Sequence, residues 1–550
     1  MDYQKLADLL YPEIDKDITY YTNLYKPRNL EKFCEVTRIA PSPTGYLHIG
    51  HLYSALINKI VAEKTNGVFY FRLEDTDRKR YIKGAGDIAY SMLCNFGIVP
   101  NEGYRGDDVL AVGNYGPYVQ SQRLEIYHTF AKHLVSLGLA FPCFCGKNEN
   151  VEEVLERREN QLETSDTIEE KDPCRNLTFE EIEQKIKNGE KFAIRLKSQG
   201  DPNKTFEFTD KIKGKRELRE NNKDVVLVKS DGIPPYSLAH VVDDTLMGTT
   251  LVVRGEEWWS SLSAHLEIFK AFGFKPPKYA HTPVICKIDE QGNKRKLSKR
   301  KDPEADARYF LKLGYPVLSL IDYLLNLLNS DYEQWRAKNP TASYKDFDFK
   351  LEKIGSNNPM FDFEKLDNIS KNVIAYFSAD EVYNMALSWA KDNDAEFAKV
   401  LEKNKNIALQ VFSIERGTQR PRKDISKFSE IKNLYGYMFN ETKKTAKFSD
   451  FDPKFSEKTI KSLIFAYLSE YNHNLNKEDW FAQIKEISSE VGFADNKEYK
   501  ANPTAFVGNV SDACAIIRVA LTGKNQTPDL YTIMQILGED EVKARLKNFC

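Results

Sequence analysis

The chain has 550 residues, with 79 Lys and Arg against 81 Asp and Glu and a formal net charge of −2. At roughly 150 residues per domain this length predicts three or four domains, each large enough to bury its own core. The balanced charge excludes a protein that binds nucleic acid through its overall charge, so an RNA partner would have to be met by local basic faces.

The composition predicts a globular protein of the cytoplasm. Apolar residues make up 41% of the chain and charged residues 29%. No apolar run reaches the roughly 20 residues that span a bilayer, and the first residues lack the basic and apolar regions of a signal peptide. The eight cysteines are too sparse and irregular for a disulfide framework, so we expect reduced thiols and no membrane segment.

Residues 1–34 form an N-terminal extension ahead of the first strand-like run. Leu6, Leu9 and Leu10 stand at helical spacing in an aromatic-rich stretch, which indicates a short helix. The pattern assigns no function to this extension.

Residues 35–138 alternate between strand and helix patterns. The expected strands are at 36–40 and 68–73, and the expected helices are at 48–62, 84–96 and 121–137. Strand, helix and strand within about 40 residues match a parallel βαβ unit. Ligands of such sheets bind beyond the carboxyl ends of the strands, where the turn at 41–44 and Glu74 fall.

Residues 139–224 break this alternation, and we interpret them as an inserted module. They contain Cys143-Phe144-Cys145, a Glu- and Arg-rich helix around 150–162 and a polar stretch at 163–172. The alternation resumes with strands at 225–228 and 250–253, which lead to Asp231 and Arg254. The sequence therefore predicts an α/β fold with a nucleotide-binding parallel sheet whose second half is 225–285. Beyond it, a basic loop opens 286–370, and 371–550 is predominantly helical.

Two short segments have the composition of a nucleotide-phosphate site. His48-Ile49-Gly50-His51 opens a predicted helix, where unpaired N–H groups and the helix dipole favour an anion. Lys296-Leu297-Ser298-Lys299-Arg300 supplies cations that suit displacement at an α-phosphate, because charge develops on the departing pyrophosphate. Taken singly, each has a simpler interpretation: helix capping for the first and a solvated loop for the second.

In this order the two segments resemble the HIGH and KMSKS signatures of class I aminoacyl-tRNA synthetases. Residues 37–45 resemble the opening of the bacterial-type glutamyl-tRNA synthetases, with Pro-Ser-Pro at 41–43 where glutaminyl and eukaryotic or archaeal glutamyl enzymes typically have Pro-Glu-Pro. The resemblance runs from about residue 35 to the end. It implies a Rossmann-like sheet split by an acceptor-binding module, then a stem-contact region at 286–370 and an all-α anticodon-binding region at 371–550.

The resemblance also implies an activity. A protein of this family forms glutamyl adenylate from ATP and L-glutamate, with Mg²⁺ accompanying ATP, and transfers the acyl group to tRNA-Glu in translation. Members of this subgroup need bound tRNA for productive activation, and we expect a monomer. The residues implied to act on ATP or its phosphates are His48, Gly50, His51, Glu257, Trp258, Lys296, Ser298 and Lys299. For Trp258 a place in the core is the alternative.

A glutamate site requires cations for two carboxylates and an acceptor for the ammonium group. Arg38, Arg254 and Glu74, all at predicted strand ends, can supply these. By resemblance, Arg38 with Tyr236 holds the γ-carboxylate, Arg254 the α-carboxylate and Glu74 the amino group. The remaining predicted glutamate-binding residues are Ala40, Ser42 and His240, the last in place of an Asn frequent in related enzymes. Ordinary salt bridges remain the alternative for either arginine.

Three cysteines of the inserted module resemble the zinc knob of some family members. They are Cys143, Cys145 and Cys174, and zinc requires four ligands. The fourth could be Glu170 or another nearby side chain. Metal-free packing of the module remains the alternative.

RNA contacts are expected from basic and aromatic residues. Candidates are the clusters at 211–216 and 420–423 and, in the helical region, Arg416, Arg420, Arg422, Tyr435, Tyr437 and Phe439. Most of these aromatic residues are expected in the core, and a solvated surface is the alternative for each cluster.

Three other functions stay open. A glutaminyl enzyme is disfavoured by Pro-Ser-Pro at 41–43, and a paralogue that glutamylates queuosine in tRNA is disfavoured by the helical C-terminal region. A silent tRNA-binding regulator is disfavoured because both phosphate segments are intact. The sequence does not decide whether tRNA-Gln is also charged.

Overall fold

The parallel βαβ unit predicted near the N-terminus is present in the computed structural model, which describes residues 1–146, 172–299 and 301–550. Strands β1 (Val36–Ile39) and β2 (Val68–Phe71) pair in parallel through α3 (Ile49–Lys64), and β3 (Glu102–Gly103) pairs with β2. Every residue of β1 is buried, as expected for a sheet covered on both faces.

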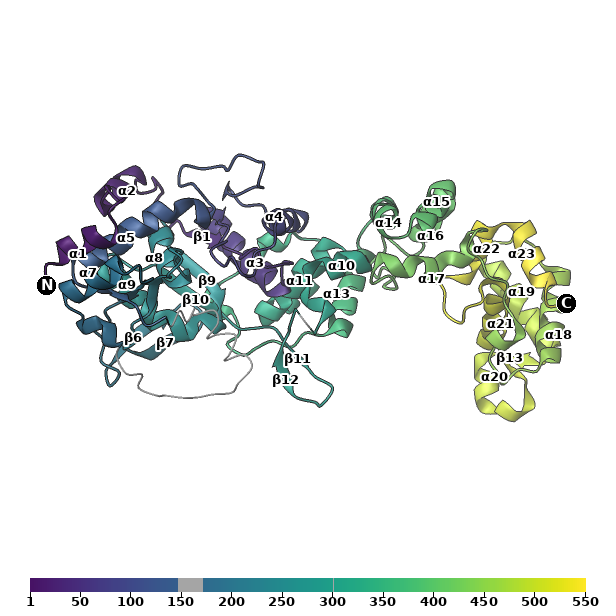
Figure 1. Cartoon of the computed structure of the whole chain (residues 1–550). Coiled ribbons are helices and arrows are strands. Elements are labelled where there is room, and N and C mark those ends of the chain that lie inside the picture. The colour runs from purple at the N-terminus through teal and green to yellow at the C-terminus, as the bar shows by residue number, and fades with distance from the viewer. Residues whose placement is uncertain (147–171, 300) are drawn as a thin grey trace. The chain divides into compact units, whose positions relative to one another are not determined.

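A second parallel pair extends this region on the other side of β1. Strand β9 (Leu251–Gly255) pairs in parallel with β10 (Lys278–Thr282), and the Thr250 N–H donates to the Val36 carbonyl at 3.0 Å. Helix α3 packs against β1, β2 and β9, and Figure 1 shows α3 next to β1. The carboxyl ends of β1 and β9 therefore lie close together, which brings the predicted site residues after each strand toward one edge.

The inserted module has an antiparallel sheet of its own. Its order is β4 (Ala140–Cys143), β5 (Ala193–Leu196), β8 (Val226–Val228). The module also contains a hairpin of β6 (Thr205–Asp210) and β7 (Gly214–Arg219), of which β6 contacts β10. The strand predicted at 225–228 thus exists, but it pairs antiparallel with β5. The prediction that it resumes the parallel alternation is wrong, because an apolar run does not specify its pairing partner. The helix expected around 150–162 lies outside the described residues.

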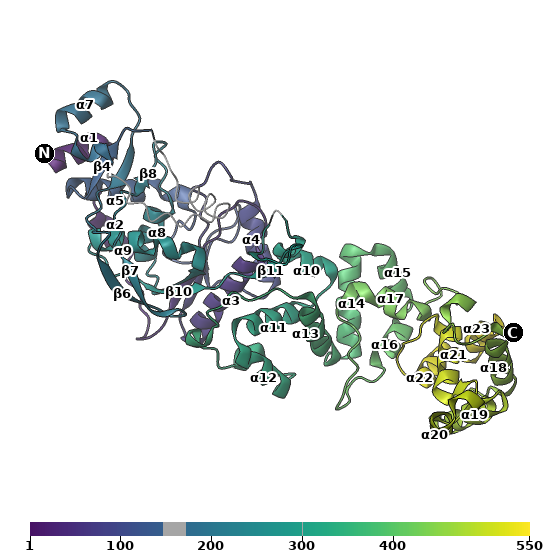
Figure 2. The ribbon, with the colours of Figure 1, turned by 90° about the horizontal axis from the view of Figure 1, so that it is seen from below.

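The N-terminal extension packs into the core of this half of the chain. Helices α1 (Tyr3–Leu10) and α2 (Ile18–Leu24) both contact α5 (Leu124–Ser136), and α1 and α5 lie side by side in Figures 1 and 2. Leu6 and Leu10 are buried, as their spacing predicts. Arg28 donates to the Met247 carbonyl at 2.8 Å.

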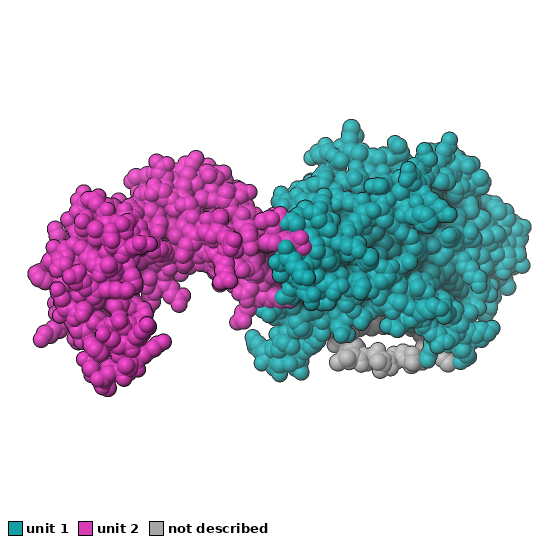
Figure 3. All heavy atoms as spheres, turned by 180° about the vertical axis from the view of Figure 1, so that it is seen from behind, with its two compact units in different colours: residues 1–309, 324–338, 342–362 teal, residues 310–323, 339–341, 363–550 magenta. Residues whose placement is uncertain are grey.

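The remaining elements complete two compact units, coloured separately in Figure 3. The first consists of residues 1–309, 324–338 and 342–362, and the second of 310–323, 339–341 and 363–550. Further elements of the first unit are α4 (Ala85–Asn95), α7 (Phe179–Lys187), α8 (Tyr236–Leu246), α9 (Leu262–Ala271), β11 (Cys286–Ile288), β12 (Lys294–Lys296) and α12 (Ser330–Lys338). Helices α10 (Ala307–Leu313) and α11 (Val317–Leu328) each have residues in both units.

The second unit is almost entirely helical. Its elements are α13 (Phe363–Ala375), α14 (Ala379–Asn393), α15 (Ala395–Lys403), α16 (Lys405–Ser413), α17 (Ile431–Tyr435), α18 (Glu457–Glu470), α19 (Lys477–Glu490), β13 (Phe493–Ala494), α20 (Asn496–Ala501), β14 (Gly508–Asn509), α21 (Val510–Thr522), α22 (Leu530–Leu537) and α23 (Glu539–Lys547). A capping box of Ser378 and Glu381 starts α14. Among the described residues, no helix has the length and apolarity to cross a membrane.

Candidate active site

His48 joins the two predicted phosphate segments. Its Nδ1 accepts a hydrogen bond from the Gly50 N–H at 2.9 Å, which caps α3 and confirms the capping interpretation. Nε2 therefore carries the proton and donates to the Leu297 carbonyl at 3.2 Å. Burial and the nearby Lys299 lower the pKa of His48 to about 4, so the ring is neutral at pH 7. His51 is exposed one turn further along, with its ring centroid 6.4 Å from that of His48.

Asp302 fixes the loop that carries Lys296, Ser298 and Lys299. Its carboxylate accepts both Nη groups of Arg295, at 2.6 and 2.7 Å, and the Ser298 N–H at 2.8 Å. Arg295 holds the pKa of Asp302 well below its usual range. Asp302 was not predicted from the sequence, although it is the first acid after six basic residues within eight positions, which was a usable signal. Arg300 lies outside the described residues.

The two lysines of this loop have different surroundings. Lys296 Nζ lies 3.7 Å from Glu257 Oε1, so the predicted nucleotide-facing glutamate does face the basic loop. Lys299 is exposed over its side chain, while partial desolvation of its ammonium group lowers its pKa. Trp258 is half-buried, with its ring centroid 4.3 Å from that of Tyr236.

Arg38 and Glu74 meet in a buried network of charges. Arg38, in β1, donates to the Tyr236 hydroxyl at 3.3 Å and lies 3.4 Å from the Asp244 carboxylate. Arg72 forms ion pairs with the same Asp244, at 2.7 Å, and with Glu74, at 2.8 Å. The neighbouring Asp243 holds Arg123 at 2.7 Å, so the Asp243-Asp244 pair is structural.

The turn after β1 lies against the turn after β2. The Glu74 N–H donates to the Pro41 carbonyl at 3.1 Å, between the half-buried Ala40 and Ser42. Burial raises the pKa of Glu74 to about 7, although Arg72 and Arg38 act in the opposite direction. Glu74 is therefore the carboxylate of this site that titrates closest to neutral pH.

His240 is enclosed by protein groups. Its ring stacks on Tyr236 with centroids 4.9 Å apart, Nδ1 lies 2.6 Å from Asp244, and Nε2 lies 3.0 Å from the Tyr279 hydroxyl. Burial lowers its pKa to about 4, so it is neutral at pH 7. Nδ1 thus faces Asp244 and Nε2 faces Tyr279, and these two contacts hold the ring in its stack on Tyr236.

Arg254 ends β9 and has imidazole partners. Its Nε donates to His281 at 3.0 Å and its Nη1 to His265 at 3.1 Å. In the described part of the chain no carboxylate lies within ion-pair distance of Arg254. The salt-bridge interpretation therefore holds for Arg38 and not for Arg254. Neither histidine was predicted from the sequence, because no local pattern marks them.

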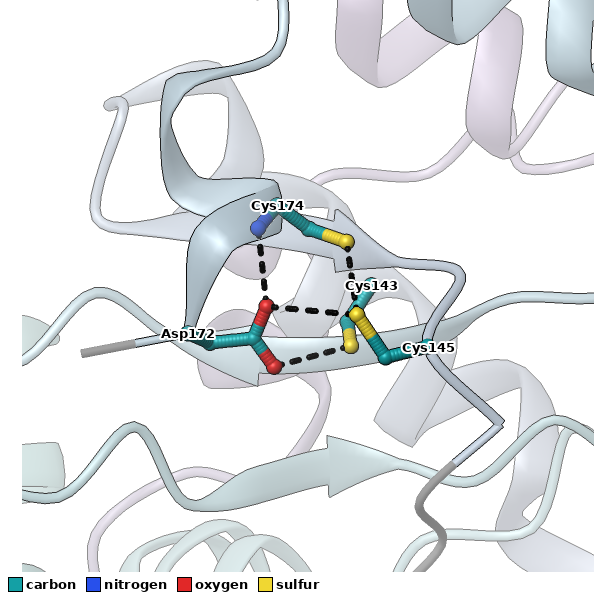
Figure 4. Close-up of side chains that lie close together, drawn as sticks. All are labelled: Cys143, Cys145, Asp172 and Cys174. Carbon is teal, nitrogen blue, oxygen red and sulfur yellow. Dashed lines mark hydrogen bonds between the residues drawn. The ribbon is translucent and has the colours of Figure 1, made fainter. Parts of the chain in front are cut away.

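The three cysteines of the inserted module lie together with the carboxylate of Asp172. One ligand atom each of Cys143, Cys145, Asp172 and Cys174 lies within 4.8 Å of the others, and Figure 4 shows the four side chains converging. Cys143 donates to Asp172 at 2.9 Å, and Cys145 Sγ lies 3.3 Å from Cys174 Sγ. Asp172 was not considered as a ligand from the sequence, and Glu170 lies outside the described residues.

The expected RNA-binding residues are partly structural. Lys213 and Lys215 pair with Glu256 and Glu207, and Arg416 donates to the Ile374 carbonyl at 2.5 Å. Tyr435, Tyr437 and Phe439 are buried, as expected for core residues. Arg422 pairs with Asp424, while Arg420 and Lys423 are exposed.

Known proteins match nearly the whole chain. Residues 35–367 match the family model described as tRNA synthetases class I (E and Q), catalytic domain. The chain belongs to the class I tRNA synthetases. Residues 381–550 match an anticodon binding domain, which confirms the predicted helical anticodon-binding region of this synthetase. The fold class expected from the sequence is confirmed as well.

Individual relatives narrow the similarity to one branch of the class I synthetases. The chain is 45% identical to the glutamate–tRNA ligase of Clostridium beijerinckii and 43% identical to that of Acetivibrio thermocellus, with 100% of each chain covered. A crystal structure of a glutamate tRNA ligase from Elizabethkingia meningosepticum in complex with its amino acid matches with a TM-score of 0.69 at 26% identity. It covers 94% of this chain and 99% of that chain.

We expect Asp302→Asn to loosen the basic loop of this synthetase. The variant loses the charge that Arg295 and the Ser298 N–H share. If the free energy of local opening falls by about 2 kcal/mol, amide exchange at residues 296–299 becomes roughly 30-fold faster. Hydrogen exchange measured by mass spectrometry checks this. Glu290→Gln, an exposed residue between β11 and β12, makes the same charge change and is expected to leave exchange unaltered. Equal protection in all three proteins would contradict the role of Asp302.

Proposed function

We propose that the protein is a glutamate–tRNA ligase, which activates L-glutamate with ATP and transfers it to the 3′ end of tRNA-Glu. The observation that carries the proposal is the position of Arg38 and Arg254. The two buried guanidiniums lie near the carboxyl ends of β1 and β9, two strands that contact each other, and the charge of Arg38 acts on Glu74. His48, at the start of the helix that follows β1, hydrogen-bonds to the basic loop. A substrate with two carboxylates and one amino group matches these charges.

The activation step is assigned to the two phosphate segments. His48, Gly50 and His51 at the start of α3 would lie against the ATP phosphates, and Glu257 and Trp258 against the adenosine. Lys296, Ser298 and Lys299 would stabilise the charge that develops on the departing pyrophosphate. Mg²⁺ would be held chiefly by the ATP phosphates, since Mg²⁺ at nucleotides takes few protein ligands.

The proposed glutamate contacts centre on Tyr236. Arg38 with Tyr236 is assigned to the γ-carboxylate, Arg254 to the α-carboxylate and Glu74 to the amino group, with Ala40 and Ser42 lining the site. Asp244 contacts Arg38 through Nε at 3.4 Å and Tyr236 accepts one Nη2 hydrogen, which leaves the other Nη hydrogens for a ligand. His240 is assigned an indirect part, because it contacts Tyr236 and Asp244.

The tRNA partner would contact three regions of the chain. Module 139–224 is assigned to the acceptor end, region 286–370 to the stem and region 371–550 to the anticodon. We infer a cytoplasmic monomer that activates glutamate productively only with tRNA bound.

An aminoacylation assay tests the proposal. Purified tRNA-Glu and tRNA-Gln are each offered glutamate and glutamine, with Lys299→Ala as the impaired control. We expect glutamylation of tRNA-Glu, and a loss of roughly 100-fold in the control, since one transition-state cation contributes about 3 kcal/mol. Charging with glutamine alone would identify a glutaminyl enzyme, and charging of neither tRNA would point to a regulator.

Arg38→Gln is expected to reduce discrimination between glutamate and glutamine. The variant leaves the γ-carboxylate of glutamate without a fixed cation, whereas the amide of glutamine never gained from that charge. The glutamate-to-glutamine ratio of kcat/KM, measured with one tRNA preparation, should fall at least tenfold. If Arg254→Gln changes the ratio and Arg38→Gln does not, the two arginines are assigned to the wrong carboxylates.

We also propose a zinc site in the inserted module. Three thiol sulfurs and one carboxylate within 4.8 Å form a donor set that suits tetrahedral Zn²⁺. Cys143, Cys145, Asp172 and Cys174 would hold the ion, which would bind the end of β4 to the segment before α7. Its function there is structural.

Elemental analysis of chelator-washed protein is expected to give about one zinc per chain. Cys145→Ser and Asp172→Asn should each lower this content and reduce thermal stability. Cys550→Ser, another exposed cysteine, is the matched control and should retain the metal. A metal-free wild type with full activity would assign the cluster to packing.

A further inference from the structure

Arg254 differs from the other buried arginines of the site in its partners, which do not include a carboxylate within ion-pair distance in the described residues. Arg38, Arg72 and Arg123 each lie against an aspartate, at 3.4, 2.7 and 2.7 Å. Arg254 is only 5% exposed, yet its hydrogen-bond partners are the rings of His281 and His265 and the carbonyl of Trp258. Its guanidinium also lies over the Tyr279 ring, 4.8 Å from the centroid. A buried cation without an anion is costly, which makes this arrangement informative.

Asp210 sets the tautomer of His281. Its Oδ2 lies 2.7 Å from His281 Nδ1, and the same carboxylate accepts the His281 N–H at 3.1 Å. Nδ1 therefore carries the proton, and Nε2 presents a lone pair to Arg254. The Asp210 carboxylate is itself fixed by the Ile212 and Lys213 N–H groups, each at 2.9 Å.

Both imidazoles accept without adding charge. Burial lowers the pKa of His281 to about 4 and that of His265 well below its usual range. Trp259 packs edge-on against His281, with centroids 5.0 Å apart, so the ring cannot turn freely. Arg254 thus keeps its positive charge while its orientation is fixed.

The hydrogen-bond count leaves room for one carboxylate. A guanidinium has five N–H donors. Nε–H is used by His281, one Nη1–H by His265 and one Nη2–H by the Trp258 carbonyl. One N–H then remains on each Nη nitrogen, and a carboxylate can accept one N–H from each of these two nitrogens.

We propose that His281, oriented by Asp210, is a positioning residue that holds Arg254 for a substrate carboxylate without cancelling its charge, and that His265 does the same from the other side. The inference rests on the proposed function. Asp210 ends β6, so the hairpin of the inserted module reaches the amino-acid site through one carboxylate and one imidazole.

The positioning role is tested by His281→Leu and His281→Gln. Leucine removes the acceptor, whereas the glutamine amide oxygen can replace it. In aminoacylation with saturating tRNA-Glu we expect His281→Leu to raise the glutamate KM on the order of 10- to 100-fold with the KM for ATP little changed. His281→Gln should recover most of this loss. Equal glutamate KM values in wild type and both variants would overturn the role of His281.

A matched pair of variants at His265 tests whether a carboxylate beside Arg254 weakens glutamate binding. His265→Gln and His265→Glu have side chains of the same size, but only glutamate adds a carboxylate beside Arg254. We expect His265→Glu to bind L-glutamate at least tenfold more weakly than His265→Gln, with a melting temperature no lower. Equal affinities would overturn the inference. If His281→Leu fails to fold, this pair still tests whether Arg254 must be held by neutral partners. A wild type that does not glutamylate tRNA-Glu would overturn the proposed function itself.

Discussion

The carboxylate of Asp244 is the point on which the site depends. It lies between Arg38 and Arg72, two buried cations that would otherwise repel each other, and it also contacts His240 and the Tyr70 hydroxyl. Burial alone would raise the pKa of Asp244, but Arg72 and Arg38 hold it well below its usual range. Its stabilising contribution is therefore present at neutral pH and is lost as the pH falls below the ordinary range of aspartate.

From Asp244 the network extends in two directions. Arg72 continues it to Glu74, and the adjacent Asp243 continues it through Arg123 to Tyr25 of the N-terminal extension, at 3.4 Å. The extension is thus part of the same packed unit, which explains why its apolar helix face is buried against α5. Removing one member of such a network leaves an unpaired buried charge.

The charged residues proposed to bind the amino acid differ in whether an opposite charge of the protein pairs with them. Arg38 and Glu74 belong to a network in which each charge has a partner, whereas Arg254 is held by neutral imidazoles. A ligand carboxylate gains more from an uncompensated cation than from one already paired. The phosphate side shows the same contrast, because Asp302 pairs with Arg295 and Lys287 while Lys299 has no carboxylate within ion-pair distance in the described chain.

The sequence by itself determined the local elements and the chemistry of the motifs. The strand at 36–40, the helix after His48 and the grouping of Cys143 and Cys145 follow from patterns within a few residues. Tertiary structure alone decided which residues meet: Arg72 and Asp244 are 172 positions apart, and His48 and Leu297 are 249 apart. It also placed the strand at 226–228 in the antiparallel sheet, made Asp172 a neighbour of three thiols and set His281 between Asp210 and Arg254. Periodicity reports the face of an element and not its partner, so these contacts had no local signal.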